Sequence, residues 1–170
     1  MEIVNIFATY LYSFQYNTSS INEYDRLIAL WRDVEYVNKF AKDNNVKNTD
    51  DFVAKVMQDA KDISLFLTNI VKDGSLLGTY FSPYNDNEMR FKVLSLQKGK
   101  NKKGSNLRLY AIKIAENLFV ITGGAIKITQ TTQEHPDTKE EHSKLNLAKQ
   151  YLESKEVFDE ETFYELLLSN

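Results

Sequence analysis

The pattern of apolar and polar residues from Leu107 to Thr129 predicts two strands joined by a tight turn, around which the rest of the chain is expected to be built. The two faces of the first strand carry Leu107, Leu109, Ala111 and Lys113 on one side, and Arg108, Tyr110, Ile112 and Ile114 on the other. Residues 115–117 supply the turn, with Asn117 suited to a positive φ. The second strand opens with the continuous apolar run 118–121, which is typical of a central strand covered on both faces. We therefore expect helices to cover this hairpin.

Upstream of the hairpin, the pattern predicts one strand and two helices. Residues 3–16 have aromatic residues at every second position from 10 to 16, which indicates a single strand. Ser20 and Glu23 have the spacing of a capping box, so a first helix is expected to run from there to about Lys42. A second helix begins near Thr49, with acidic residues in its first turn, and Gly74 ends it.

The remaining segments complete an α+β pattern. Residues 76–87 are irregular, 90–96 predict a strand, and 97–106 predict a flexible basic loop. After the hairpin, Thr138 and Glu141 repeat the capping-box spacing and open a third helix, and Asp159 caps a short last one. This order predicts a mainly antiparallel sheet with N-terminal helices packed on it and a C-terminal helix. We expect one domain over residues 1–170.

Composition narrows the class of protein. The chain has 170 residues, 42% of them hydrophobic, which is enough for a packed core. It has no cysteine, which excludes disulfides and thiolate chemistry. No apolar run approaches the roughly 20 residues that span a bilayer, and the start lacks the pattern of a signal peptide. We expect a soluble cytoplasmic protein that does not bind membranes.

Charge is distributed unevenly along the chain. The net charge is −3, yet the segment from Met89 to Lys113 has eight basic residues and no acidic one. Residues 1–88 hold 8 basic and 13 acidic residues, and residues 114–170 hold 5 and 11. An acidic protein with one basic segment beside its central hairpin is expected to have an anionic partner.

Motifs of well-known enzyme classes are absent from the sequence. It has neither a P-loop nor a GxGxxG motif, and Gly123-Gly124 is interpreted as a bulge or a point of close packing. His135 and His142 have no neighbours typical of a zinc site and are interpreted as surface histidines. No metal or cofactor is expected.

The basic segment has two interpretations. It is either a solvated lysine loop that keeps the hairpin soluble, or a surface that binds phosphate groups. In the second case aromatic residues such as Tyr110, Tyr80 and Tyr84 could stack on bases, although core packing is the usual role of any one aromatic residue.

Part of the hairpin and the following helix resembles the RelE/HigB-like toxin superfamily of bacterial toxin–antitoxin systems. The resemblance is carried by the strand LRLYAI from Leu107, by the segment GAIKIT from Gly124 to Thr129, and by the helical segment AKQYL from Ala148. The expected order of strands and helices is also similar to that of the family. The matching stretch covers about a quarter of the chain.

This resemblance implies a ribosome-dependent mRNA endonuclease that needs no metal, with RNA or the ribosome and an antitoxin protein as partners. In that chemistry a ribose 2′-OH attacks the adjacent phosphate, and basic side chains hold the phosphate and stabilise its charge. The implied catalytic residues are Arg108, Lys127 and Lys113. The implied RNA-binding residues are Lys98, Lys100, Lys102, Lys103, Tyr110 and Thr129.

Two features favour an alternative from another class. Ile128 stands where the family has a second lysine, and the isoelectric point is about 5.5, whereas active toxins of the family are strongly basic. The alternative is a non-catalytic binding module with the same fold, whose hairpin docks an acidic protein partner. The sequence is compatible both with an active enzyme and with a fold that has lost catalytic activity.

Overall fold

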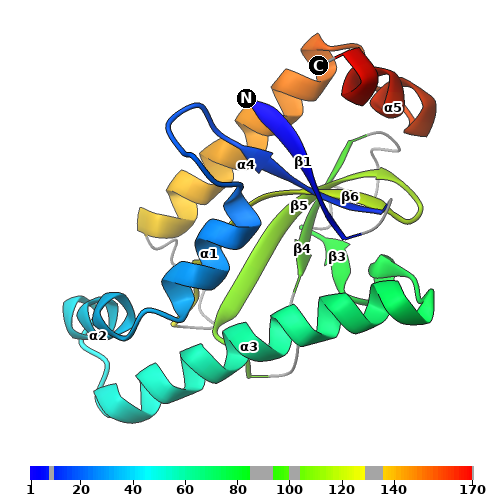
Figure 1. Ribbon diagram of the computed structural model, residues 1–170. Helices are drawn as coiled ribbons and strands as arrows, with labels where there is room; N and C mark the ends of the chain where they lie inside the picture. Colours follow the sequence, from blue (N-terminus) through cyan, green and yellow to red (C-terminus); the bar gives the residue numbers. More distant parts are fainter. Residues whose placement is uncertain (8–9, 85–93, 100–103, 129–135, 170) are drawn as a thin grey trace.

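A six-stranded sheet forms the centre of the part of the chain that the computed structural model describes, which comprises residues 1–7, 10–84, 94–99, 104–128 and 136–169 (Figure 1). Its strands are β1 (Glu2–Phe7), β2 (Leu11–Gln15), β3 (Phe81–Pro83), β4 (Ser95–Gly99), β5 (Leu107–Ala115) and β6 (Leu118–Ile126). Their order across the sheet is β1-β2-β6-β5-β4-β3. Every neighbouring pair is antiparallel except β2 and β6, which run parallel. The predicted α+β class and the mainly antiparallel sheet are therefore confirmed.

Helices cover both faces of this sheet. In the described ranges they are α1 (Glu23–Trp31), α2 (Val34–Asp43), α3 (Thr49–Asp73), the short 3-10 helix η1 (Leu77–Thr79), α4 (Pro136–Ser154) and α5 (Glu160–Ser169). One core joins the first three helices to the sheet through residues such as Leu27, Ile63 and Leu109. A second core joins α4 and α5 to the opposite face through residues such as Leu145, Phe163 and Ile112. Figure 1 shows α4 running behind the sheet while α3 crosses its other side.

The predicted hairpin is confirmed as β5 and β6, and its strand faces are the expected ones. Leu107, Leu109 and Ala111 pack in the core below α1 to α3, whereas Tyr110, Ile112 and Ile114 pack against α4 and α5. Every residue of β6 is buried, as the apolar run predicts for a central strand.

The tight turn differs from the prediction in one respect. Asn117 is not among the non-glycine residues with positive φ in the described chain, which are Asn45, Leu94 and Glu156. Instead, its side-chain oxygen accepts a hydrogen bond of 2.7 Å from the backbone N–H of Leu77. The turn is therefore fixed by this contact with η1 rather than by a left-handed backbone.

The N-terminal prediction was wrong in three respects. The single strand over 3–16 is a hairpin, in which β1 pairs with β2 from Glu2 opposite Gln15. The single first helix is two helices, because Asp33 caps α2 by accepting a 3.1 Å hydrogen bond from Tyr36 N–H. Asn22, not the predicted Ser20, caps α1 through a bond of 3.0 Å from Asp25 N–H.

Later boundaries were predicted better. α3 begins at Thr49 and ends before Gly74, which has a left-handed backbone with φ of 68°. Asp159 caps α5 as expected, accepting from Thr162 N–H. α4, however, begins at Pro136, so the position of Thr138 is within the helix rather than at its start.

The predicted strand at 90–96 and basic loop at 97–106 are shifted. β4 starts at Ser95 and includes Lys98 and Gly99, while 90–93 and 100–103 lie outside the described residues. Among the helices that the structure describes, none combines the length and apolar character needed to cross a membrane.

Candidate functional site

Three of the predicted basic residues meet at one end of the β4-β5-β6 ladder. Lys98 lies directly opposite Tyr110, which is two residues from Arg108 on the same face of β5. Arg108 lies opposite Ala125, and Lys127 N–H donates to the Asn106 carbonyl just beyond. Diagonal neighbours of this kind are roughly 7–8 Å apart. Lys98, Arg108 and Lys127 can therefore face one extended ligand.

Lys113 does not belong to this group. It shares the α3 side of β5 with Leu109 and Ala111, whereas Arg108 shares the opposite side with Tyr110. The two residues are also five positions apart along a strand, which is roughly 16 Å. Lys100, Lys102, Lys103 and Thr129 lie outside the described residues.

Arg108 is partly used by the protein itself. Its Nη1 donates to the backbone carbonyls of Ser105, at 2.7 Å, and Leu107, at 2.8 Å. Burial lowers the pKa of its guanidinium, and the nearby Tyr110 and Tyr80 act in the opposite direction. These hydrogen bonds fix the guanidinium at the start of β5, where it remains half-buried.

Aromatic side chains lie beside these basic residues on the α4 side of the sheet. Tyr110 is only 7% exposed and meets the ring of Tyr84 edge-on, with the ring centres 5.7 Å apart. Burial raises the pKa of Tyr110 to about 12. The ring of Tyr84 also stacks on that of His142, an exposed residue of α4, with the ring centres 5.5 Å apart. We call Lys98, Arg108, Tyr84, Tyr110 and His142 the α4-side cluster.

Sequence reasoning assigned part of this cluster differently. Tyr110 is packed as the core-packing interpretation expects, while Tyr84 is the more accessible ring. His142 was interpreted as a surface histidine, and it is exposed, but its stacking partner lies 58 residues earlier in the chain. No local pattern around His142 could have indicated that contact.

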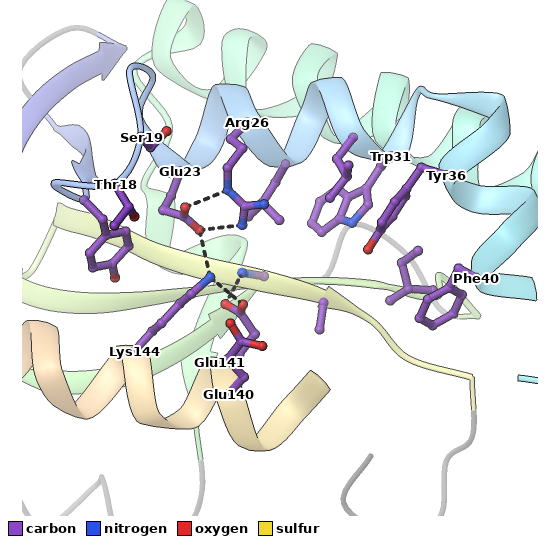
Figure 2. Close-up of a pocket in the computed structure, with 16 residues that line it drawn as sticks. Thr18, Ser19, Glu23, Arg26, Trp31, Tyr36, Phe40, Glu140, Glu141 and Lys144 are labelled. Carbon is purple, nitrogen blue, oxygen red and sulfur yellow. Dashed lines mark hydrogen bonds and ion pairs between the residues drawn. The ribbon is translucent and has the colours of Figure 1, made fainter. Parts of the chain in front are cut away.

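A second candidate site is a cavity of about 450 Å³ beside the end of β6, which we call the β6 groove (Figure 2). α1 and α2 form one wall, α4 forms the other, and residues 124–126 of β6 lie between them. Its polar lining includes Tyr16, Glu23, Arg26, Tyr36, Glu141 and Lys144. None of the sequence-predicted site residues that the structure describes lines this cavity.

Four charged side chains bridge the groove from α1 to α4. Arg26 holds Glu23 through Nε and Nη2, at 2.7 and 2.9 Å. Lys144 Nζ lies 2.8 Å from Glu141 and 3.4 Å from Glu23. Figure 2 shows Lys144 reaching from α4 towards Glu23 across β6. Glu23 is 3% exposed and is the first residue of α1, where the helix dipole favours a negative charge.

Burial governs the protonation of this network. Desolvation raises the pKa of the Glu141 carboxyl, although the Lys144 ammonium and the Gly124 N–H lower it. The hydrogen bonds with Glu23 raise the pKa of the Arg26 guanidinium. Tyr16 donates to the Thr122 carbonyl at 2.7 Å, and burial raises its pKa. The groove therefore holds compensated charges rather than a free acid and base.

Gly123 and Gly124 are points of close packing in β6, as the close-packing interpretation expected. The β5–β6 register shifts at Tyr110 and Ala111, which leaves Thr122 as an extra residue in β6. A Cβ on Gly123 would lie 1.9 Å from Glu141 Oε2, and one on Gly124 would lie 2.6 Å from the Arg108 carbonyl. Both predicted features, the bulge and the close packing, are present.

Comparisons of the chain with protein-family models, with curated proteins and with solved structures found no match. In the described ranges no group of three or more histidine, cysteine, aspartate or glutamate residues could hold a metal ion.

Proposed function

We propose that this chain has a RelE-like fold of toxin–antitoxin type and cleaves RNA at the α4-side cluster, with ribosome-bound mRNA as substrate. The observation that carries the proposal is the placement of Lys98 and Arg108 on one side of the sheet beside Tyr84 and His142. Cationic groups hold phosphates, and an accessible aromatic ring stacks on a base, so the cluster offers both contacts that a single RNA strand needs.

The reaction requires two proton transfers. As the 2′ oxygen forms a bond to phosphorus, its proton must leave, and as the bond to the 5′ oxygen breaks, that oxygen must gain a proton. Imidazole is the side chain best suited to both steps near neutral pH. We assign His142 to proton transfer, Arg108 and Lys127 to the negative charge of the transition state, and Lys98 to phosphate binding. The products are a 2′,3′-cyclic phosphate and a 5′-hydroxyl end.

Lys113 is not part of the proposed catalytic site, because it lies on the other side of β5. It serves as a control for Lys98: both are lysines of neighbouring strands, but Lys113 lies on the other face, is half-buried rather than exposed, and pairs with Ser95 further along the ladder. The proposed role in RNA binding rests on sequence position alone for Lys100, Lys102, Lys103 and Thr129.

The second candidate function is a non-catalytic module whose hairpin binds an acidic protein. A specific observation favours it: two hydrogen bonds from Arg108 already go to backbone carbonyls of the chain itself. A guanidinium that makes these hydrogen bonds has fewer N–H donors left to stabilise the phosphate in the transition state. The two functions differ in one product, because only the enzyme shortens RNA.

The test is induced expression in a bacterium, with growth scored and RNA ends mapped. We expect growth arrest and new mRNA ends with the unaltered chain, and loss of both in His142→Gln, whose side chain is exposed and whose removal leaves the core intact. Lys113→Ala should behave like the unaltered chain.

Purified ribosomes with a defined mRNA provide the second measurement. Cleavage by the unaltered chain that persists at the same rate in His142→Gln would overturn the assignment of the proton-transfer residue. Intact RNA together with normal growth, given soluble protein, would overturn the endonuclease and support the binding module.

A further inference from the structure

The helix that carries His142 is held on the sheet near its start by one buried carboxylate. Glu141 Oε2 accepts a hydrogen bond of 2.9 Å from Gly124 N–H, and Glu141 Oε1 lies 2.8 Å from Lys144 Nζ. Residues 139 and 140 are exposed, so Glu141 is the first buried side chain in the part of α4 whose burial the structure describes. This contact therefore fixes the N-terminal part of α4 against β6.

Gly123 leaves an empty position on the α4 side of β6, and the Glu141 carboxylate occupies it. A Cβ on Gly123 would lie 1.9 Å from Glu141 Oε2. Gly123 lies directly opposite Tyr110 of β5, whose ring belongs to the core on the α4 side. After burial and Tyr84, the Glu141 carboxylate is a further cause of the raised pKa of Tyr110. The carboxylate thus packs beside Tyr110, where a side chain of residue 123 would otherwise lie.

A chain of contacts leads from this position to His142. Tyr110 meets Tyr84 edge-on, with ring centres 5.7 Å apart, and Tyr84 stacks on His142 with ring centres 5.5 Å apart and an angle of 30° between the planes. His142 directly follows Glu141, and successive residues of an α-helix project roughly 100° apart around its axis. Because His142 is exposed, burial does not hold its ring in place. The rotation and height of α4, which Glu141 fixes, direct the ring to Tyr84.

We propose that Glu141 is the positioning residue of the α4-side cluster: its contact with Gly123 and Gly124 keeps the His142 ring against Tyr84. The inference rests on the proposed function, in which His142 transfers protons, but the place of the ring is measured without RNA. Position matters for such a group, because a displacement of roughly 1 Å can lower a reaction rate about a hundredfold.

The contact requires a hydrogen-bond acceptor at the end of the side chain. Glu141→Gln keeps an oxygen that accepts from Gly124 N–H and should keep the ring in place, whereas Glu141→Ala removes the contact. Gly123→Ala displaces the carboxylate from the other side, with α4 itself unaltered. Glu153→Ala is the matched control, since it removes an exposed carboxylate from the same helix.

The measurement is the nuclear Overhauser cross-peak between the ring protons of His142 and Tyr84. The chain has two histidines, so His142→Gln identifies the signals by their loss. We expect the cross-peak in the unaltered chain, Glu141→Gln and Glu153→Ala, and its loss in Glu141→Ala and Gly123→Ala. With ribosomes and a defined mRNA, the two variants without a cross-peak should cleave at least tenfold more slowly, and Glu141→Gln should cleave within twofold of the unaltered rate.

Three results would overturn the proposal. These are a cross-peak that persists in Glu141→Ala, a cross-peak that is lost in Glu153→Ala as well, and unaltered cleavage by both variants that lack the cross-peak. Gly123→Ala decides the question if Glu141→Ala does not fold. Intact RNA with the unaltered chain, together with the expected pattern of cross-peaks, would support the positioning by Glu141 and contradict the endonuclease alone.

Discussion

At the scale of single residues, Gly124 is a position at which β5 and α1 pack closely against β6. A Cβ there would meet the Arg108 carbonyl at 2.6 Å, Trp31 at 2.9 Å and Leu27 at 3.0 Å. A backbone carbonyl in a central ladder cannot move cheaply, so we expect Gly124→Ala to lower the free energy of unfolding by about 1–3 kcal/mol. Chemical denaturation measures this change.

Gly123→Ala is the matched control. The three atoms nearest to its Cβ would all belong to the Glu141 side chain, which can move away at the cost of its contacts with Gly124 N–H and Lys144. We expect a smaller loss of stability than for Gly124→Ala. An equal or larger loss would contradict the view that backbone contact sets the requirement for glycine at 124.

Glu141 gives the protein a pH dependence of known sign. Burial raises its pKa in the folded state above that of the unfolded chain, so the folded state holds the proton more tightly. This contribution to stability is complete below the unfolded pKa and is lost as pH rises through the folded pKa. We expect Glu141→Gln to remove this decrease in the free energy of unfolding with rising pH.

The measurement is urea denaturation across pH 3 to 8 on both proteins. The free energy of unfolding of Glu141→Gln should rise relative to that of the unaltered chain as pH increases through this range. A constant difference between the two proteins would show that Glu141 titrates alike in the folded and unfolded states.

At the scale of elements, Asp33 separates α1 from α2 by capping the second helix. Its carboxylate accepts from Tyr36 N–H at 3.1 Å. We expect Asp33→Ala to lower the free energy of unfolding by about 1 kcal/mol, because the first turn of α2 loses a partner for a backbone donor. Thermal unfolding measures this, and Asp33→Asn, which keeps the acceptor, should recover most of the loss.

The sequence predicts helices and strands well where a helix-breaking residue such as glycine ends a long periodic pattern of apolar residues. It predicts them poorly where no such residue marks the end of one element and the start of the next. α3 was bounded correctly because Gly74 adopts a conformation that other residues avoid. Only residues 8–10 separate β1 from β2, and none of them is glycine or proline, so no breaker in the sequence marks the reversal. The break at Asp33 is likewise hidden, since apolar residues continue at helical spacing on both sides.

At the scale of the whole molecule, alternation along β5 already separated Arg108 from Lys113, and the structure confirms the two faces. The β6 groove could not be predicted, because Glu23 and Lys144 lie 121 residues apart and meet only through the parallel pairing of β2 with β6. The stacking of His142 on Tyr84 depends in the same way on where α4 lies.

The two faces of β5 lead to a prediction about salt. If RNA lies along the α4 side, Lys98 and Lys127 each release a counterion on binding, and Lys113 releases none. We expect the slope of log affinity against log salt concentration for single-stranded RNA to fall by roughly 0.7 for Lys98→Ala and for Lys127→Ala. Fluorescence anisotropy between 50 and 300 mM salt measures the slope.

Lys113→Ala tests the geometry rather than the net charge. It removes the same charge from the same sheet, yet its side chain lies on the α3 side of β5. An unchanged slope for Lys113→Ala, beside reduced slopes for the other two variants, would locate RNA on one face. Equal reductions in all three slopes would mean that RNA affinity depends only on the overall charge of the basic segment. That result would contradict an RNA-binding site at the α4-side cluster.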